Sequence, residues 1–319
     1  MCVRKACDAI GVKLDPEKWQ MGQEIAVLGA LFDVSLLREY TLWVKPKPAR
    51  IRNLSAEIDD IIAQDCLSAS RAARIVGKFG FVTDQLYGKV GRAAVTSLRQ
   101  RQYSQKRDSG LTEDLRISLG LVKAFLHCCP PRQVKLTKSS EHPVLLYTDA
   151  SDVPGRPGGQ YVVGAVLFHP GLPHRAEYTY MVVPTSVVSD WIPKQTQIGQ
   201  LEVFAAPVAL DTWKHILQGR EAILLIDNSS AMHSLIKGYS PKLDTVKLVG
   251  DFWLRAAQLG LDVFVDRVES KSNIADGPSR LDISLVESLG YRFVPPTTTL
   301  LSAVPCRDTF LWFQTGVGA

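Results

Sequence analysis

The alternation of apolar and polar positions predicts a series of short strands from the middle of the chain onward. Apolar, β-prone runs at residues 144–149 and 161–168 are separated by a polar, Gly/Pro-rich segment, which predicts a hairpin with a wide connection. Residues 175–183 alternate well enough for a third strand. Apolar positions then recur at helical spacing over residues 197–217, and a fourth strand follows at residues 222–227. We expect the first three strands to be antiparallel neighbours.

The pattern ends with two helices, one more strand and a short helix. Helices are expected at residues 229–237 and 242–259, the second ended by Gly260, and a strand is expected at residues 261–268. The last short helix is expected after Asn273. The resulting order, βββαβααβα, predicts an α/β fold with a mixed five-stranded sheet and helices on its faces.

The first part of the chain has a mainly helical pattern. Strand-like and extended fragments come first, and the predicted helices cover residues 55–65, 68–80, 83–101 and 115–128. Two prolines and a polar stretch up to His142 indicate a boundary between the two parts. We therefore expect one domain at residues 1–138, a second at residues 139–285, and a tail at residues 286–319 without a functional signal.

Length and composition agree with two soluble domains. The 319 residues exceed one small core, and a hydrophobic share of 46% with 22% charged residues excludes a disordered chain. No uninterrupted apolar run reaches the roughly 20 residues of a membrane-spanning helix, and the polar N-terminus lacks the apolar region of a secretory signal. We therefore expect an intracellular protein without a membrane partner. None of the six cysteines has the spacing of a zinc site or a redox dithiol, so we expect free thiols.

The net charge of +5 is unevenly distributed. Residues 1–138 hold 23 Lys and Arg against 14 Asp and Glu, whereas residues 139–319 hold 14 against 18. Basic surface attracts phosphate backbones without reading their sequence, and clusters of carboxylates hold divalent metal ions. The two parts therefore suit one task on nucleic acid, although ordinary solvated faces explain the charge alone equally well.

Four acidic residues occupy matching points of the α/β pattern. Asp149 and Asp227 each end an apolar strand, and carboxylates on neighbouring buried strands repel each other unless a cation neutralises them or a pKa rises. Glu202 lies in an otherwise apolar helical stretch, on the border of the face turned to the sheet, and Asp276 follows the last strand at a helix start. Each acid alone is also explained as a turn former or a helix cap. Their joint recurrence favours a metal site.

These acids lie in the phrases LLYTDAS, IGQLEVFAA, LLIDNSSAMHSLIKG and VESKSNIADGPSRL, and over about residues 143–281 the sequence resembles the ribonuclease H domain of retroelement reverse transcriptases. The resemblance implies a ribonuclease H-like fold and hydrolysis of the RNA strand of an RNA–DNA hybrid. It also implies that Asp149, Glu202, Asp227 and Asp276 are the catalytic residues and the ligands of two Mg²⁺ ions, with Mn²⁺ as an alternative. Oxygen ligands suit these ions, and two of them roughly 4 Å apart can activate water and stabilise the leaving 3′ oxygen.

The sequence departs from the family pattern in one loop. Cellular members have a mobile histidine before the last acid, whereas residues 267–273 contain none, so slower turnover is expected. Asn273 resembles a family position near the substrate, and an N-cap role explains it equally well. A nuclease of the same fold acting on DNA is a further alternative, because the choice of a hybrid depends on contacts to 2′-hydroxyl groups.

Residues 10–33 resemble the region just beyond the polymerase active site of reverse transcriptases, and the helices that follow resemble the thumb and connection, which grip a template–primer duplex in that family. On a continuous helix over residues 83–101, Lys89, Arg92 and Arg99 fall within an arc of about 80° and are candidate substrate-binding residues, although a solvated face explains them equally well. No Tyr-x-Asp-Asp hairpin is present. We therefore expect a fragment of a longer polyprotein whose upstream polymerase part is a partner. The alternative is an inactive remnant that binds nucleic acid.

Overall fold

The computed structural model describes residues 20–297 except 28, 85–88, 105–108, 129–130, 138–141, 154–159, 170, 172–175, 190, 192–193 and 195. The polar N-terminus, most of the Gly-rich connection after residue 153 and the end of the tail lie outside these residues, as does the boundary expected near residue 138. Within the described ranges, no helix is both long and apolar enough to cross a membrane. Of the six cysteines, Cys66 is described with its side chain, and it is a free thiol as expected.

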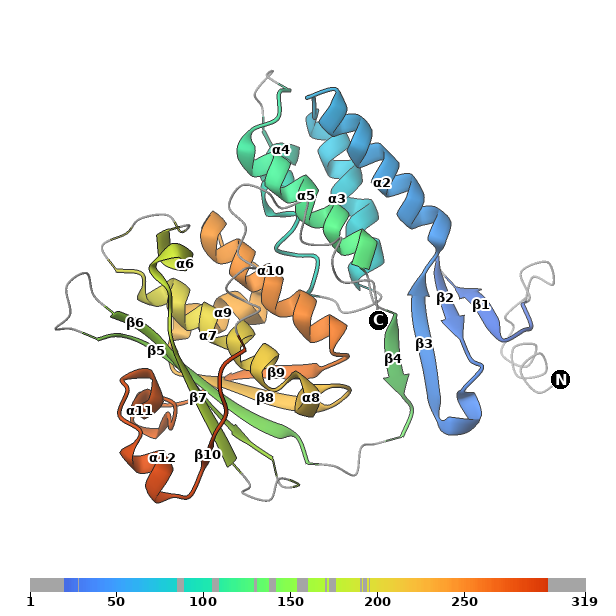
Figure 1. The fold of residues 1–319 in the computed structure, drawn as a ribbon. Helices are drawn as coiled ribbons and strands as arrows, with labels where there is room; N and C mark the ends of the chain where they lie inside the picture. Colours follow the sequence, from blue (N-terminus) through green and yellow to red (C-terminus); the bar gives the residue numbers. More distant parts are fainter. Residues whose placement is uncertain are drawn as a thin grey trace.

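A mixed sheet forms the centre of the second half of the chain (Figure 1). Its strands lie in the order β10-β7-β6-β5-β8-β9. The first three in sequence are antiparallel neighbours, whereas β5, β8 and β9 are parallel, as the predicted order of elements requires. The strands are β5 (Val144–Val153), β6 (Gln160–Phe168), β7 (Ala176–Val182), β8 (Glu221–Ile226), β9 (Asp262–Arg267) and β10 (Arg292–Phe293). The expected mixed sheet is thus confirmed, and the short β10 adds a sixth strand parallel to β7.

The strand that contains the first acid is longer than the sequence pattern indicates. We expected Asp149 at the end of its strand, but β5 continues four residues further because β6 pairs with it as far as Val153. On its other side β5 pairs with β8 only up to Thr148, which lies opposite Ile226. Asp149 therefore lies within the sheet, and Asp227 follows directly where the neighbouring strand ends.

Helices cover both faces of this sheet (Figure 1). The adjacent residues Leu146 and Tyr147 of β5 belong to two separate apolar clusters, since successive side chains of a strand point to opposite faces. The larger cluster packs under α7 (Ile198–Thr212), α9 (Ser229–Lys237) and α10 (Leu243–Gln258), and the smaller one packs under α11 (Asp276–Ser279) and α12 (Ser284–Ser288). The short helices α6 (Thr185–Ser189), α8 (Lys214–Leu217) and η3 (Ser270–Ser272) complete this half.

The first half contains a small sheet as well as helices. Its strands β1 (Glu24–Val27), β2 (Ala30–Asp33), β3 (Thr41–Pro46) and β4 (Arg132–Lys135) are joined in that order and are all antiparallel. The short helix η2 (Leu37–Glu39) precedes β3, and four helices follow it, α2 (Pro48–Ala63), α3 (Ala69–Asp84), α4 (Thr96–Gln102) and α5 (Glu113–Cys128). The strand-like and extended fragments expected at the start of the chain include β3, which ends at Pro46 because Pro48 begins α2.

The helix expected over residues 83–101 is wrong. After α3 ends at Asp84, residues 89–95 form turns, and α4 begins only at Thr96. The consecutive residues Ala93, Ala94 and Val95 in these turns are all buried. The common arc expected for the three basic residues of this segment therefore does not exist.

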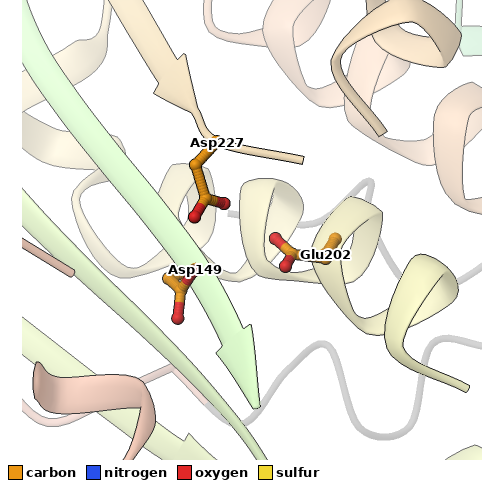
Figure 2. Close-up of side chains that lie close together, drawn as sticks. All are labelled: Asp149, Glu202 and Asp227. Carbon is orange, nitrogen blue, oxygen red and sulfur yellow. The ribbon is translucent and has the colours of Figure 1, made fainter. Parts of the chain in front are cut away.

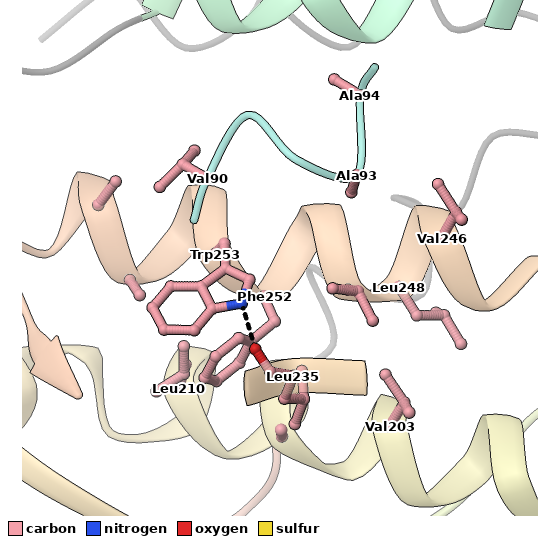
Figure 3. Close-up of a cluster of buried hydrophobic side chains, with 14 of the residues drawn as sticks. Val90, Ala93, Ala94, Val203, Leu210, Leu235, Val246, Leu248, Phe252 and Trp253 are labelled. Atoms are coloured by element: carbon pink, nitrogen blue, oxygen red, sulfur yellow. Dashed lines mark hydrogen bonds between the residues drawn. The ribbon is translucent and has the colours of Figure 1, made fainter. Parts of the chain in front are cut away.

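The same turns join the two halves of the molecule (Figure 3). Ala93 points toward α10, and the buried apolar side chains of both halves, Val90 and Ala94 among them, form one continuous cluster. Within it the indole Nε1 of Trp253 donates a hydrogen bond of 2.9 Å to the carbonyl oxygen of Leu235 (Figure 3). This bond links α10 to the last part of α9. The turns at residues 89–95 contact the same end of α9, where Arg92 donates to the carbonyl oxygen of Lys237.

Candidate metal centre

Three of the four predicted acids converge beside the sheet (Figure 2). Asp149 comes from the middle of β5, Asp227 directly follows β8, and Glu202 comes from the second turn of α7. One carboxylate oxygen from each lies within 4.8 Å of the other two. Asp149 and Glu202 are only 4% and 5% exposed, so this is a buried cluster of like charges rather than a solvated acidic surface.

Local structure explains why Asp227 lies there. Its neighbour Asn228 caps α9, since the Asn228 side chain accepts hydrogen bonds from the backbone N–H groups of Ser230 and Ala231 at 3.0 and 3.1 Å. The cap ends the strand and starts the helix at this point. Asp227 is thereby held between the two elements, at the level of Asp149 on the neighbouring strand.

Burial and the neighbouring negative charges disfavour the ionised forms of Asp149 and Glu202. Burial, with the charges of Asp149, Asp227 and Asp276, raises the pKa of Glu202 to about 9. Burial also raises the pKa of Asp149 to about 6, supported by the charges of Asp227 and Asp276 and opposed by a hydrogen bond from Ser279. Without a cation Glu202 therefore keeps a proton that an ordinary carboxyl group has lost at neutral pH.

The residues present fit a hard divalent cation. The donor set consists of carboxylate oxygens, which Mg²⁺ and Mn²⁺ prefer. Moreover, the Oε2 atom of Glu202 is buried and has no hydrogen-bond partner among the described residues. A buried polar atom without a partner is costly unless something else satisfies it, and a cation among the three carboxylates would do so.

The fourth predicted acid lies outside this group of three. Asp276 begins α11, its side chain is 42% exposed, and its Oδ1 atom pairs with the Nε atom of Arg280 at 2.7 Å. Its charge nevertheless raises the pKa of both Asp149 and Glu202, so it lies at the rim of the same site. The structure thus brings three acids together and keeps the fourth beside them, in an ion pair.

Two further polar residues contact Asp149. Asn273 is buried, and its Nδ2 atom lies 3.3 Å from Oδ1 of Asp149 and 3.1 Å from the carbonyl oxygen of Thr148. Its Oδ1 atom accepts a hydrogen bond from the backbone N–H of Ala275 at 3.2 Å, so its amide group is used within the protein. The hydroxyl group of Ser279, which is fully buried, donates to Oδ2 of Asp149.

Sequence analysis missed Ser279 and also the glycine that makes its contact possible. Gly164 lies directly opposite Asp149 in the β5–β6 pair. A Cβ atom at this position would come within 2.4 Å of the backbone nitrogen of Ser279 and 2.9 Å of the carbonyl oxygen of Ala275. The only signal in the sequence is a glycine inside an apolar strand, which often indicates a close approach of another backbone.

The three predicted basic residues lie at the junction of the two halves and beyond it. Lys89 is partly buried, with its Nζ atom 5.1 Å from the ring centroid of Trp253, and burial lowers its pKa. Arg92 donates to the carbonyl oxygen of Lys237, at the end of α9, at 3.3 Å. Arg99 lies on α4 and is exposed. The helix α9 therefore extends from Asp227 at its start to the basic junction at its end.

Comparison with known proteins identifies similar solved structures but no matching protein family. No protein-family model and no curated protein matches the chain. The structure is similar to the N-terminal RNase H domain of a Mycobacterium tuberculosis protein, solved as a fusion with maltose binding protein, at 18% identity and a TM-score of 0.32, covering 46% of this chain and 98% of that one. It is also similar to RNase H1 from the halophilic archaeon Halobacterium salinarum, at 18% identity and a TM-score of 0.32, covering 45% and 100%. The second half of the chain has a ribonuclease H-like fold, as the order of its elements predicts.

Proposed function

We propose that this protein is a metal-dependent endonuclease of the ribonuclease H type, which hydrolyses the RNA strand of RNA–DNA hybrids. The observation that supports this most strongly is the buried group of Asp149, Glu202 and Asp227, in which one oxygen of Glu202 has no partner among the described residues. Such an arrangement is costly in a protein that does not bind a cation. A metal-dependent phosphodiester hydrolase uses this arrangement directly.

The four acids would act as metal ligands in the proposed mechanism. Asp149, Glu202 and Asp227 would hold the metal from three elements of the fold, and Asp276 would add a fourth carboxylate after leaving Arg280. When bound, two Mg²⁺ ions, or Mn²⁺ in their place, would activate the attacking water and stabilise the leaving 3′ oxygen. The chain itself supplies no nucleophile in this scheme. Its acids would hold the metal ions and balance their positive charge.

The proposed substrate contacts extend away from the acids. Lys89, Arg92 and Arg99 would meet phosphates of the hybrid, because all three are basic and the first two lie at the end of the helix that begins beside Asp227. Asn273 would act beside the reacting strand, and its contact with Asp149 supports this part of the proposal. The surplus of basic residues in the first half supports this arrangement.

The wider context is also part of the proposal. We infer that the chain is a part of a retroelement reverse transcriptase without its polymerase active site, with residues 1–138 corresponding to the end of the palm and the thumb and connection. The sequence phrases that resemble this family support the inference, as does the absence of a Tyr-x-Asp-Asp motif from the sequence. The upstream polymerase part would then be a partner.

Two observations favour a second candidate, a nucleic-acid-binding remnant without activity. Asp276 is paired with Arg280 instead of facing the other acids, and no histidine precedes it in residues 267–273. A site that has lost its turnover would tolerate both features. The three buried acids argue against decay, since they are costly to keep without a cation.

Cleavage of an end-labelled RNA–DNA hybrid by the purified full chain distinguishes the two candidates. The assay contains Mg²⁺ and is run beside single-stranded RNA, duplex DNA and an Asp227→Asn variant, which keeps the shape of the side chain but removes its charge. The nuclease proposal expects cutting of the RNA strand of the hybrid alone, and loss of this cutting in the variant. A folded wild-type protein that binds hybrid and cuts nothing with Mg²⁺ or Mn²⁺ would establish the binding protein instead.

A further inference from the structure

A small helix on the opposite face of the sheet from α7 touches the first acid directly. The helix α11 packs against β5 and β6, and its last residue, Ser279, has no solvent exposure. The hydroxyl group of Ser279 donates to Oδ2 of Asp149. It also lies 2.9 Å from the carbonyl oxygen of Asp276, in the first turn of the same helix. One hydroxyl group thus connects the acid in the sheet to the segment that carries the acid at the rim.

The position of Ser279 is itself held from the sheet. Ser151, two residues after Asp149 and on the same face of β5, donates from its hydroxyl group to the carbonyl oxygen of Ser279 at 2.5 Å. The absence of a side chain at Gly164 lets the backbone of α11 lie against β6. Ser279 is therefore fixed in place by two strands, and its contact with Asp149 is not an accident of a free side chain.

These contacts define the orientation of the Asp149 carboxylate. Oδ2 receives the hydroxyl group of Ser279, and Oδ1 lies 3.3 Å from the Nδ2 atom of Asn273. A carboxylate has about four lone-pair sites, so two donors leave each oxygen able to accept one more partner. Both donors come from the segment that contains Asp276, which leaves the remaining lone pairs of Asp149 for the side where Glu202 and Asp227 lie.

We propose that Ser279 is a positioning residue, which holds the Asp149 carboxylate in the orientation needed to bind a divalent cation together with Glu202 and Asp227. The inference rests on the metal site of the proposed function. It adds that α11 sets the geometry of the site from behind the sheet, through a hydroxyl group that itself touches neither metal nor substrate. Partners that orient a ligand typically contribute a factor of about 10 to 100 to metal affinity or activity.

The test is the affinity of the full chain for Mn²⁺, measured by calorimetric titration after removal of bound metal with a chelator. A Ser279→Ala variant removes the hydroxyl group and should weaken Mn²⁺ binding by about 10-fold or more. Ser151→Ala keeps Asp149 and Ser279 but removes the hydrogen bond that holds the backbone of Ser279. We therefore expect a smaller loss of Mn²⁺ affinity than in Ser279→Ala. The matched control is Ser240→Ala, which removes another buried serine hydroxyl group, one that accepts a hydrogen bond from the backbone N–H of Lys242.

Thermal unfolding without metal separates positioning from mere stability. A purely structural role would lower the Tm of Ser279→Ala while the folded protein kept the Mn²⁺ affinity of the wild type, and that result overturns the proposal. If Ser279→Ala does not fold, Ser151→Ala decides in the same way. If the wild type itself does not bind Mn²⁺, the metal site of the proposed function fails and this inference with it, whereas tight wild-type binding with no loss in the folded variants contradicts the positioning role alone.

Discussion

Asp149 and Gly164 lie directly opposite each other in the antiparallel β5–β6 pair, and the backbone of α11 occupies the space that a side chain at Gly164 would need. Strand, glycine and helix together allow Ser279 to reach the acid in the sheet. The candidate metal centre is therefore supported on both faces of the sheet, by α7 through Glu202 on one and by α11 through Ser279 on the other.

The close approach of α11 to Gly164 can be tested by adding a side chain at this position. Gly164→Ala places a Cβ atom 2.4 Å from a backbone nitrogen that cannot move without shifting α11, so we expect destabilisation of about 1–3 kcal/mol or more. Displacement of Ser279 should also reduce hybrid cleavage, on the order of 100-fold for a shift of about 1 Å. Denaturant unfolding and the cleavage rate measure the two effects. Gly120→Ala in α5, where nothing lies within 4 Å, is the matched control and should stabilise by up to about 1 kcal/mol.

The stability of the metal-free protein should decrease as the pH rises. Folding raises the pKa of Glu202 from 4.5 to about 9, so between these values the folded state holds a proton that the unfolded state has released. The free energy of unfolding then falls with increasing pH across this window, and Asp149 adds to the fall between 3.8 and about 6. Thermal unfolding in a chelator should show this slope, and saturating Mg²⁺ or Mn²⁺ should reduce it. A slope that is unaffected by metal would contradict the assignment of these acids as ligands.

Replacing Glu202 by a neutral residue should increase the stability of the metal-free protein and abolish hybrid cleavage. Glu202→Gln keeps the size of the side chain and is neutral in both states, whereas the wild-type Glu202 must take up a proton on folding near pH 8. The metal-free variant should therefore be more stable than the wild type by on the order of 1–4 kcal/mol at that pH. The same variant should lose hybrid cleavage, because a ligand is missing. The Tm in a chelator and the cleavage rate are compared with those of Glu221→Gln, an exposed acid at the start of β8. A variant that is less stable than the wild type and still active would contradict this account.

The basic residues should differ in what they contribute. Arg99 is exposed on α4, so Arg99→Ala should weaken hybrid binding and reduce the slope of log affinity against log salt by about 1 while leaving Tm unchanged. Lys89 packs its ammonium group on the ring of Trp253, so Lys89→Ala should also lower the stability of the junction, by about 0.5–2 kcal/mol. Filter binding at several salt concentrations and thermal unfolding measure these effects. Equal salt slopes for Arg99→Ala and the wild type would remove Arg99 from the proposed contacts.

The convergence of the acids could be expected from sequence because local patterns determine where strands begin and end. The apolar runs before Asp149 and Asp227 predicted neighbouring strands, and the helical spacing around Glu202 predicted an adjacent helix. The extent of β5 beyond Asp149 could not be predicted, since it depends on pairing with β6 and not on its own composition. The ion pair of Asp276 depends similarly on a rotamer of Arg280.

Other features depend on contacts that are distant in the chain or on elements too short to produce a pattern. Ser279 reaches Asp149 across 130 positions of sequence, and Gly164 has a role only because α11 lies against it. The short polar strand β4 and the two-residue strand β10 have no periodicity that separates them from loops. The turns at residues 89–95 were predicted as helix because their apolar residues are buried in a cluster shared with elements distant in the chain, with Ala93 against α10.

The central claim is that Asp149, Glu202 and Asp227 bind a divalent cation jointly. The most direct measurement is an anomalous-difference map from crystals of the full chain soaked in Mn²⁺, with Asp227→Asn crystals as control. We expect a peak coordinated by an oxygen of each of the three carboxylates in the wild type, and a weak or absent peak in the variant. Wild-type crystals saturated with Mn²⁺ that show no peak among these carboxylates would contradict the account.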